Sequence, residues 1–386
     1  MELFRKETGK NFVCFLLFIC FIPVKALPPI IACGNTRTEE YFPLLRQKKI
    51  AVTANHTSLI NGKHLVDSLL SAGFTVVGIF CPEHGFRGAQ EAGEKVHSCR
   101  DRKTGLPVIS LYGKNKKPSP AELKDVDIML FDIQDVGVRC YTYLSTLHYV
   151  MEACAEKNIP VIVLDRPNPN GFYIDGPVLE KKYLSFAGLH PVPLVYGMTI
   201  GEYARMINGE GWLKNGIRCD LHVVTCKHYT HDSLYVLPVR PSPNLPTMRA
   251  VYLYPSLVLF EGTVIHVGRK TSFPFEVFGH PEMTDVPFSY TVCTGKEKIT
   301  YHGMDLHNIP EDSLVKQKFT LRYLLYAYQH FPDKEHFFNP YFYNLSGCAS
   351  LKKMIIEGAD EETIRQTWQP DLQKFISIRS KYLLYP

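Results

Sequence analysis

The stretch that decides the fold is Val126-Asp-Ile-Met-Leu-Phe-Asp-Ile-Gln-Asp135, followed by a helical pattern and then by Pro160-Val-Ile-Val-Leu164. The first six residues of the first run and all of the second are almost wholly apolar, which is typical of parallel strands covered on both faces. Apolar residues between the runs recur at three and four positions and predict an amphipathic crossover helix over residues 142–157. The recurring residues are Leu144, Leu147, Met151, Cys154 and Ala155.

Two more strands are predicted upstream, at Ile50-Ala-Val-Thr53 and Phe74-Thr-Val-Val-Gly-Ile-Phe80, with a short helix over Leu65–Ala72 between them. This alternation predicts an α/β fold, a Rossmann-like, doubly wound and mostly parallel sheet over residues 36–240. No Gly-x-Gly-x-x-Gly motif follows a strand. The sequence therefore lacks the phosphate loop of a dinucleotide-binding domain.

The pattern changes near residue 240, where prolines stiffen the chain. Aromatic residues then become dense, and helices are predicted around Leu321–Gln329 and Glu361–Leu383. We expect a second, smaller α+β auxiliary domain over residues 241–386 that completes a cleft with the first. The prolines are Pro238, Pro241, Pro243, Pro246 and Pro255.

The first residues predict a secretory signal peptide over residues 1–26. Charged residues precede the apolar run Phe12–Val24, which is shorter than the roughly 20 residues that cross a bilayer, and no transmembrane segment is expected. Val24-Lys25-Ala26 permits cleavage after Ala26, whereas Ile30-Ile31-Ala32-Cys33 resembles a lipoprotein box that would be acylated at Cys33. An exported protein, periplasmic or secreted, is predicted.

Charge and cysteine content exclude several classes of protein. The 43 lysines and arginines barely outnumber the 38 aspartates and glutamates, so neither a nucleic-acid binder nor a polybasic membrane protein is indicated. The 11 cysteines form no Cys-x-x-Cys pair, which argues against a zinc site. We expect no metal and no organic cofactor, and the composition selects no oligomeric state.

Polar clusters follow all four predicted strands. Because the carboxyl ends of parallel strands meet at one edge of a sheet, where ligands bind in open α/β folds, we expect a binding site there. Asn55, Gln134 and Asn168 are candidate binding residues at this edge. The clusters are Asn55-His56-Thr57, Pro82-Glu83-His84-Gly85, Asp132-Ile133-Gln134-Asp135 and Asp165-Arg166-Pro167-Asn168-Pro169.

Glu83 is the candidate general acid. It follows an apolar strand and a proline, so we expect it to be partly desolvated at the sheet edge, as suits an acid catalyst. The alternative is that Glu83 pairs with Arg87 or caps the following turn. His84 is a candidate base or orienting group, or else a residue that satisfies local hydrogen bonds.

Asp132 and Asp165 end adjacent strands, and either is a candidate for the second group that glycoside hydrolysis requires. Their alternative role is to hold backbone amides and arginines in place. Tyr141 and Tyr143 begin the crossover helix, where each could donate a hydrogen bond, stack against a sugar, act as a nucleophile or simply pack.

Four arginines near the predicted edge are candidates for binding a substrate carboxylate bidentately. Structural pairing with aspartates is the alternative, and it would occupy most of them. They are Arg87, Arg139, Arg166 and Arg269.

Nine ordered motifs run along the chain: Asn55-His56-Thr57, Pro82-Glu83-His84-Gly85, Gly93-Glu94, Ser110-Leu111-Tyr112-Gly113, Phe131-Asp132-Ile133-Gln134-Asp135-Val136-Gly137, Tyr141-Thr142-Tyr143, Asp165-Arg166-Pro167-Asn168-Pro169, Pro241-Ser242-Pro243-Asn244-Leu245-Pro246-Thr247 and Glu261-Gly262-Thr263. Together they resemble the exo-β-N-acetylmuramidase family, formerly a domain of unknown function, from about Leu44 onward. The resemblance implies a Rossmann-like domain and an auxiliary domain with the active site between them. It also implies Glu83 as catalytic carboxylate, a tyrosine partner for which Tyr141 and Tyr143 are candidates, and Glu261 on the substrate side.

The function implied is an exo-acting glycoside hydrolase that releases terminal N-acetylmuramic acid from peptidoglycan fragments. The lactyl carboxylate of that sugar matches the arginines. One departure concerns Gly268-Arg269-Lys270-Thr271, where the family usually reads Gly-Arg-Gly-Thr, and residues 264–267 are apolar apart from His266. We expect substrate preference to differ more than reaction type.

Two rival functions remain. A periplasmic binding protein for cell-wall sugars would use a similar cleft without an acid catalyst. A serine or cysteine hydrolase is disfavoured, because no Gly-x-Ser-x-Gly elbow occurs and Cys81 lies within a strand rather than at a turn.

Overall fold

A computed structural model describes residues 29–87, 98–295 and 297–386. The predicted signal peptide, residues 1–26, and the Gly93-Glu94 motif lie outside these ranges. Seven strands form one sheet in the order β5-β6-β4-β1-β7-β8-β9, parallel except where β5 meets β6. The strands are β1 (Lys49–Ala54), β4 (Thr75–Cys81), β5 (Cys99–Arg100), β6 (Pro107–Ser110), β7 (Ile128–Asp132), β8 (Val161–Leu164) and β9 (Leu221–Val224). The predicted α/β fold is confirmed.

The chain reverses its direction of winding in the middle of this sheet. From β1 it moves outward through β4 to β6, and then returns to the other side of β1 for β7, β8 and β9. β1 and β7 are therefore neighbours, with Ala54 beside Asp132 at their carboxyl ends. Such a reversal opens a crevice beyond the strand ends, which is where ligands bind in folds of this class.

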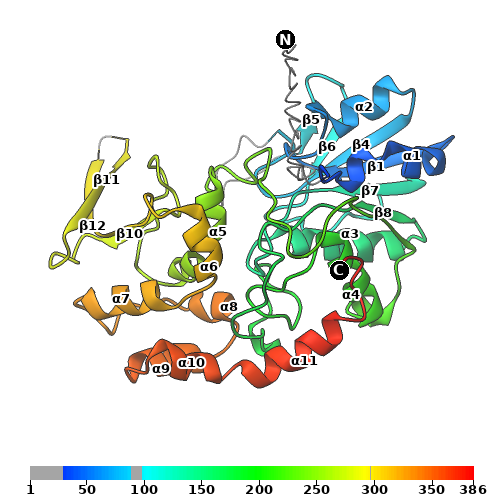
Figure 1. The fold of residues 1–386 in the computed structure, drawn as a ribbon. Helices are drawn as coiled ribbons and strands as arrows, with labels where there is room; N and C mark the ends of the chain where they lie inside the picture. The colour runs from blue at the N-terminus through cyan, green and yellow to red at the C-terminus, as the bar shows by residue number, and fades with distance from the viewer. Residues whose placement is uncertain (1–28, 88–97, 296) are drawn as a thin grey trace, which may run out of the picture. The chain divides into compact units, whose positions relative to one another are not determined.

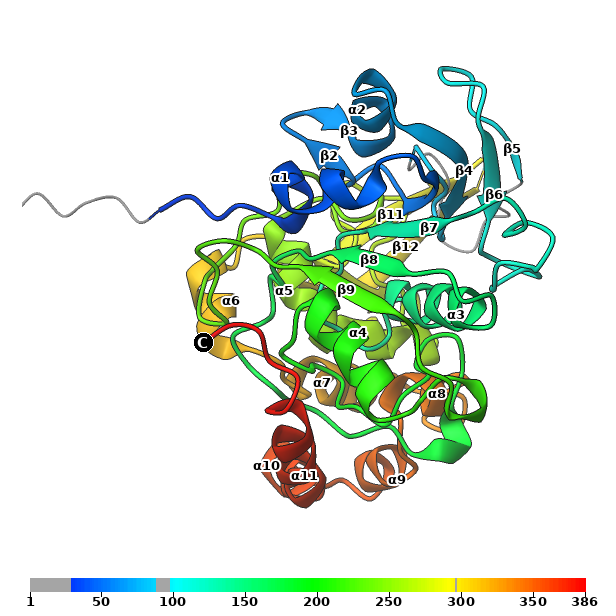
Figure 2. The same cartoon turned by 90° about the vertical axis from the view of Figure 1, so that its right-hand side faces the viewer.

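Both faces of the sheet are covered, which explains the nearly unbroken apolar runs. Because side chains alternate along a strand, Met129 and Phe131 of β7 pack into one hydrophobic cluster and Ile128 and Leu130 into another. Figure 2 shows helices on the two sides of the sheet. These helices are α3 (Tyr143–Ala155) and α4 (Ile200–Gly209) on one side, and α1 (Thr38–Tyr41) and α2 (Leu65–Ser71) on the other.

The C-terminal third contains a three-stranded antiparallel sheet in the order β10-β12-β11 together with helices (Figure 1). The expected smaller α+β part is thus present, whereas a domain boundary at residue 240 stays a prediction. Its elements are α5 (Met248–Leu257), the 3-10 helix η5 (Val258–Gly262), β10 (Val277–His280), β11 (Phe288–Thr294), β12 (Glu297–Asp305), α6 (Glu311–Gln317), α7 (Arg322–His330), α8 (Phe342–Ser346), α9 (Ser350–Ile356), α10 (Glu361–Gln366) and α11 (Gln369–Arg379). A small hairpin, β2 (Leu59–Ile60) and β3 (Lys63–His64), precedes α2.

The helix predicted over Glu361–Leu383 is instead two helices, α10 and α11. Pro370 lies in the first turn of α11. Proline has no backbone N–H and its ring clashes with the preceding turn, so it disfavours helix interiors and is tolerated in a first turn, which is where α11 places it. The helix predicted around Leu321–Gln329 agrees with α7 to within one residue at each end.

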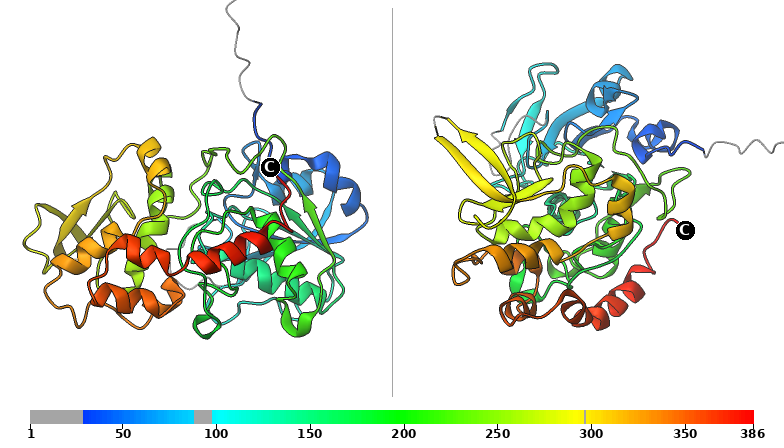
Figure 3. Two further views of the ribbon diagram at one scale, coloured as in Figure 1. Left: turned by 60° about the horizontal axis from the view of Figure 1, so that its bottom comes forward. Right: turned by 60° about the vertical axis from the view of Figure 1, so that its left-hand side comes forward.

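The end of the chain returns to the parallel sheet. Figure 3 shows α11 running from α10 toward α4. Beyond α11, Leu384 N donates to Glu202 Oε1 of α4 at 2.7 Å, and the Tyr385 hydroxyl donates to Asp165 Oδ2 at 2.6 Å. The tail therefore helps to satisfy a buried carboxylate at the end of β8. Within the described residues, no helix has the length and apolar character needed to cross a membrane.

Candidate active site

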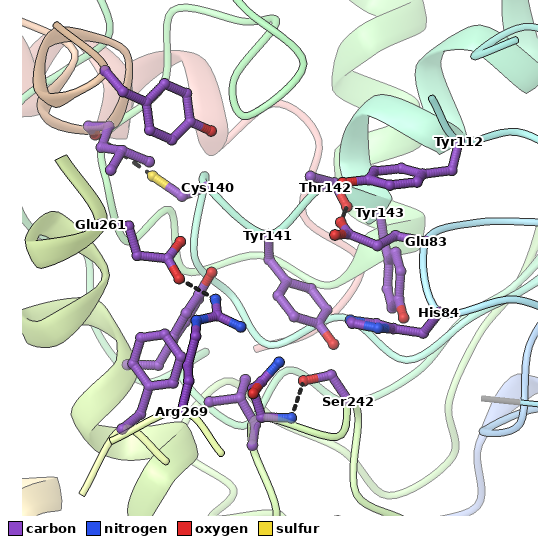
Figure 4. A pocket seen from close by; sticks show the side chains of 16 residues that line it. Glu83, His84, Tyr112, Cys140, Tyr141, Thr142, Tyr143, Ser242, Glu261 and Arg269 are labelled. Carbon is purple, nitrogen blue, oxygen red and sulfur yellow. Dashed lines mark hydrogen bonds and ion pairs between the residues drawn. The ribbon is translucent and has the colours of Figure 1, made fainter. Parts of the chain in front are cut away.

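A cavity of about 310 Å³ lies beyond the carboxyl end of β4 (Figure 4). Its walls come from the turn after β4, the residues that begin α3, the loop over residues 242–245, and the segment from η5 to β10. Six residues selected from the sequence line it together. They are Glu83, His84, Tyr141, Tyr143, Glu261 and Arg269.

A tight turn brings Glu83 to the cavity. It begins directly after β4 and is closed by a hydrogen bond from Gly85 N to Pro82 O at 3.0 Å. His84 has φ of 70°, a left-handed conformation that costs a non-glycine residue about 1 kcal/mol. Such strain persists only where the surroundings fix the backbone, and it often accompanies a functional position.

The Glu83 carboxylate is oriented by two hydroxyl groups. Thr142 Oγ1 donates to Glu83 Oε2 at 2.9 Å, and the Tyr112 phenol is a second hydrogen-bond partner. Burial, and then the negative charge of Glu83, raises the pKa of Tyr112, so its phenol keeps its proton and donates. The Arg87 guanidinium pairs with Asp101 at 2.9 Å. The hydrogen bonds from Thr142 and Tyr112 therefore fix the orientation of the Glu83 carboxylate in the cavity wall.

Tyr141 and Tyr143 form the floor beside Glu83. The Tyr141 hydroxyl donates to Pro241 O at 2.9 Å, and Asn55 Nδ2 donates to the Tyr143 hydroxyl at 3.0 Å. Burial raises the pKa of both phenols well above neutral pH. They are therefore protonated at neutral pH, which suits hydrogen-bond donors and packing surfaces better than phenolate nucleophiles.

The opposite wall carries an ion pair between Glu261 and Arg269. The Arg269 guanidinium also lies over the Phe275 ring, 5.2 Å from its centroid. Figure 4 shows this pair facing the cavity across from Glu83. Of the four arginines considered from the sequence, Arg269 is the one among the cavity-lining residues.

Asp132 lies away from the cavity lining. Its side chain is fully buried, and it accepts hydrogen bonds from Arg166 Nε at 2.6 Å and Asn35 Nδ2 at 3.1 Å. Both carboxylate oxygens are therefore engaged inside the protein. These surroundings do not support the expected catalytic role and match the alternative, a carboxylate that holds an arginine at the strand end.

Asp165 is likewise fully buried, and its hydrogen bonds connect parts of the fold. It accepts hydrogen bonds from Thr199 Oγ1 at 2.7 Å, from Gly201 N at 2.7 Å and from the Tyr385 hydroxyl. Burial raises the pKa of its carboxyl to about 6. Its contacts fasten β8 to the start of α4.

The remaining candidates hold the loops behind the cavity. Arg139, also buried, donates to the carbonyl oxygens of Pro177 and Val192 at 2.8 and 2.9 Å. Gln134 Nε2 donates to Pro167 O, and Asn168 Nδ2 to Met198 O, each at 2.8 Å. These side chains join neighbouring loops of the sheet edge and do not line the cavity.

Several cavity residues were not selected from the sequence. Tyr112 follows β6, so the rule that led to Glu83 also applied to this residue. The others come from loops or helix ends whose direction the sequence pattern does not specify. They are Thr142, Ser242, Asn244, Tyr254 and Tyr341.

Comparison with known proteins identifies the family of the chain. The N-terminal family model of exo-β-N-acetylmuramidase NamZ matches residues 50–249, and the C-terminal model matches residues 252–385. The peptidoglycan β-N-acetylmuramidase NamZ of Bacillus subtilis is 40% identical over 93% of this chain and 92% of its own length.

Two crystal structures of DUF1343 family proteins from Bacteroides fragilis are similar throughout. One has a TM-score of 0.86 at 44% identity and the other a TM-score of 0.79 at 30% identity, each covering 92% of this chain and 99% of the other. These matches span both parts of the fold. The chain therefore belongs to the exo-β-N-acetylmuramidase NamZ family.

Proposed function

We propose that this protein is an exo-acting glycoside hydrolase that releases terminal N-acetylmuramic acid from peptidoglycan fragments. The observation that carries the proposal is the placement of Glu83, which two hydroxyl groups orient in a cavity whose far wall bears Arg269. The Bacillus subtilis relative is named for this activity, and it covers nearly the whole chain.

Glu83 is the group that transfers a proton to the leaving glycosidic oxygen. The glycosidic bond then breaks through an oxocarbenium-like state that a nearby negative charge stabilises, and water adds to the anomeric carbon to give the free sugar. Among the described lining residues, Glu261 is the other carboxylate. We assign it that stabilising role in place of Asp132, whose oxygens are engaged away from the cavity.

Arg269 is the candidate for recognising the lactyl carboxylate that distinguishes muramic acid from glucosamine. A guanidinium binds a carboxylate through paired N–H donors. Its ion pair with Glu261 and its contact with Phe275 fix its position in the wall. The two protonated tyrosines supply a polar and aromatic floor for the sugar ring.

A direct assay tests the function. The purified protein is incubated with a chromogenic β-N-acetylmuraminide and with the matching β-N-acetylglucosaminide. We expect clearly faster cleavage of the muraminide. Equal rates would remove the muramic-acid assignment, and no cleavage of either would favour a binding protein.

A cysteine hydrolase fits the cavity poorly. Cys140 is the cysteine among the described lining residues, and burial raises the pKa of its thiol to about 11. Burial likewise raises the pKa of Cys81 to about 12. Neither is a thiolate at neutral pH, as nucleophilic attack requires.

We further propose that the protein is exported, since the substrate lies outside the cytoplasm and residues 1–26 have the pattern of a signal peptide. Cell fractionation with detection of the processed chain tests this. Cleavage after Ala26 predicts a free protein, whereas acylation at Cys33 predicts membrane association. An unprocessed chain in the cytoplasm would contradict export.

A further inference from the structure

A rigid turn over residues 242–245 forms one side of the cavity. Asn244 N donates to Ser242 Oγ and Leu245 N to Ser242 O, both at 3.2 Å. The hydroxyl of Tyr141 holds the preceding carbonyl, that of Pro241, at 2.9 Å. The turn is therefore fixed to the same segment that orients Glu83.

The side-chain amide of Asn244 is not fully hydrogen-bonded within the described residues. Only 6% of the residue is exposed, and its Nδ2 atom is buried and has no hydrogen-bond partner among the described residues, although the residue lines the cavity. Leaving a buried amide donor unpaired costs about 1 to 3 kcal/mol. Buried polar groups in native proteins nearly always have a partner. The terminal amide torsion is broad, so a small rotation presents Nδ2 to a ligand in the cavity.

The side chains around Asn244 indicate which ligand group would accept a hydrogen bond from its Nδ2 atom. Leu245, Tyr254 and Phe275 also line the cavity, and each is more than nine-tenths buried, so this part of the lining consists of apolar and aromatic side chains. A carboxylate would be drawn to the cation of Arg269, and a hydroxyl has no apolar part to bury. An acetamido group combines one carbonyl acceptor with one methyl group, which matches an amide donor beside apolar side chains.

We propose that Asn244 and Leu245 form the subsite for the 2-acetamido group of the sugar, with Asn244 Nδ2 donating to its carbonyl oxygen and Leu245 contacting its methyl group. The proposal rests on the proposed function. It adds that this wall of the cavity recognises the 2-acetamido group of the substrate. It makes Asn244 a specificity-determining residue that requires the acetyl group on the sugar nitrogen.

The test measures the activity of two forms of the enzyme on two substrates. Wild type and Asn244→Ala are compared on a chromogenic β-N-acetylmuraminide and on the same compound without its acetyl group. We expect the substitution to lower kcat/KM for the acetylated substrate by about 10- to 100-fold and to change that for the free amine by less than about twofold. An equal loss on both substrates would overturn the subsite.

Asn208→Ala is the matched control. Asn208 lies on α4 and its side chain bonds Cys219 N and Cys219 O at 2.8 and 2.9 Å, outside the cavity lining. Its loss should lower stability without changing the preference between the two substrates. If Asn244→Ala fails to fold, Asn244→Asp keeps the shape while replacing the donor by an acceptor, and it should show the same selective loss.

Binding separates this proposal from the hydrolase assignment. Calorimetry measures the affinity of wild type for N-acetylmuramic acid and for muramic acid. At least tenfold tighter binding of the acetylated sugar, lost in the Asn244 variants, supports the subsite even if neither chromogenic substrate is cleaved. Equal affinities, or no binding of either sugar, would overturn it.

Discussion

Thr142 Oγ1 donates a hydrogen bond to Glu83 Oε2 across 2.9 Å and so joins the turn after β4 to the beginning of α3. Thr142 stands between Tyr141 and Tyr143, which both line the cavity. One segment therefore supplies part of the sugar-facing surface and also aims the carboxylate. The position of Glu83 depends on how α3 seats against the sheet.

Replacing Glu83 by Gln should abolish most turnover while leaving the fold intact. Glutamine keeps the shape and the hydrogen-bonding reach but cannot deliver a proton, and general acid help is typically worth about 10²- to 10⁴-fold in rate. We expect a kcat loss in this range with a nearly unchanged Tm. Substrates with very acidic leaving groups should lose less. Wild-type rates on poor leaving groups would contradict the assignment.

Arg269→Ala should reduce discrimination between muraminide and glucosaminide. The lost contact is a charged hydrogen bond to a carboxylate, worth about 1.5 to 3 kcal/mol, so kcat/KM for the muraminide should fall by about 10- to 100-fold. The glucosaminide has no lactyl group and should be affected much less. A parallel loss on both substrates would mean that Arg269 acts through Glu261 rather than on the substrate.

Asp132→Ala should destabilise the protein rather than its chemistry. The substitution leaves Arg166 buried without its partner, and breaking such a pair costs about 3 to 5 kcal/mol. Urea unfolding should show this loss, whereas kcat per folded molecule should stay within a few fold of wild type. A stable variant with turnover reduced a hundredfold would restore Asp132 as a catalytic candidate.

Lys270→Gly should stabilise the protein slightly. Lys270 has φ of 60°, which lies in the left-handed region that favours glycine. The left-handed backbone costs lysine about 1 kcal/mol, partly offset by the extra freedom of glycine in the unfolded chain. Urea unfolding should show a gain of up to about 1 kcal/mol. Lys114→Gly, at an exposed site outside the positive-φ residues, should show none.

His266 should make stability depend on pH between about 4 and 6.5. Its Nδ1 accepts a hydrogen bond from Gly268 N at 3.2 Å, and burial lowers its pKa to about 4, below the ordinary value of about 6.5. In this window the unfolded chain binds a proton that the folded protein excludes, so the free energy of unfolding falls as pH decreases. His266→Gln should lose less stability than wild type between pH 7 and 5. Identical pH profiles would refute this role.

The parallel sheet was predictable because strands that are buried on both faces consist almost entirely of apolar residues. Val161–Leu164 is apolar at every position, and so is β7 up to Phe131. The β11–β12 hairpin was not predicted, although Phe288, Tyr290 and Val292 alternate with polar residues as in a half-buried strand. The break between α10 and α11 depends on Pro370, whose effect a periodicity count over Glu361–Leu383 overlooks.

The site was predictable as a location but only partly as a set of residues. The sheet rule places both Glu83 and Asp132 at the correct edge. Which one faces the cavity depends on the turn after each strand, and the left-handed backbone at His84 cannot be read from residue type. Asn244 lies in the Pro241–Thr247 motif, but that its amide nitrogen has no partner among the described residues follows only from the folded turn.

The hydrogen bond between Tyr385 and Asp165 can form only late in the synthesis of the chain. The two residues stand 220 positions apart, so the ribosome synthesises 220 residues beyond Asp165 before the end of β8 acquires this partner. Until then, the buried Asp165 carboxylate lacks one of its donors. The buried hydrogen bonds at the end of β8 are therefore completed only when the segment after α11 has been synthesised and has folded back onto the sheet.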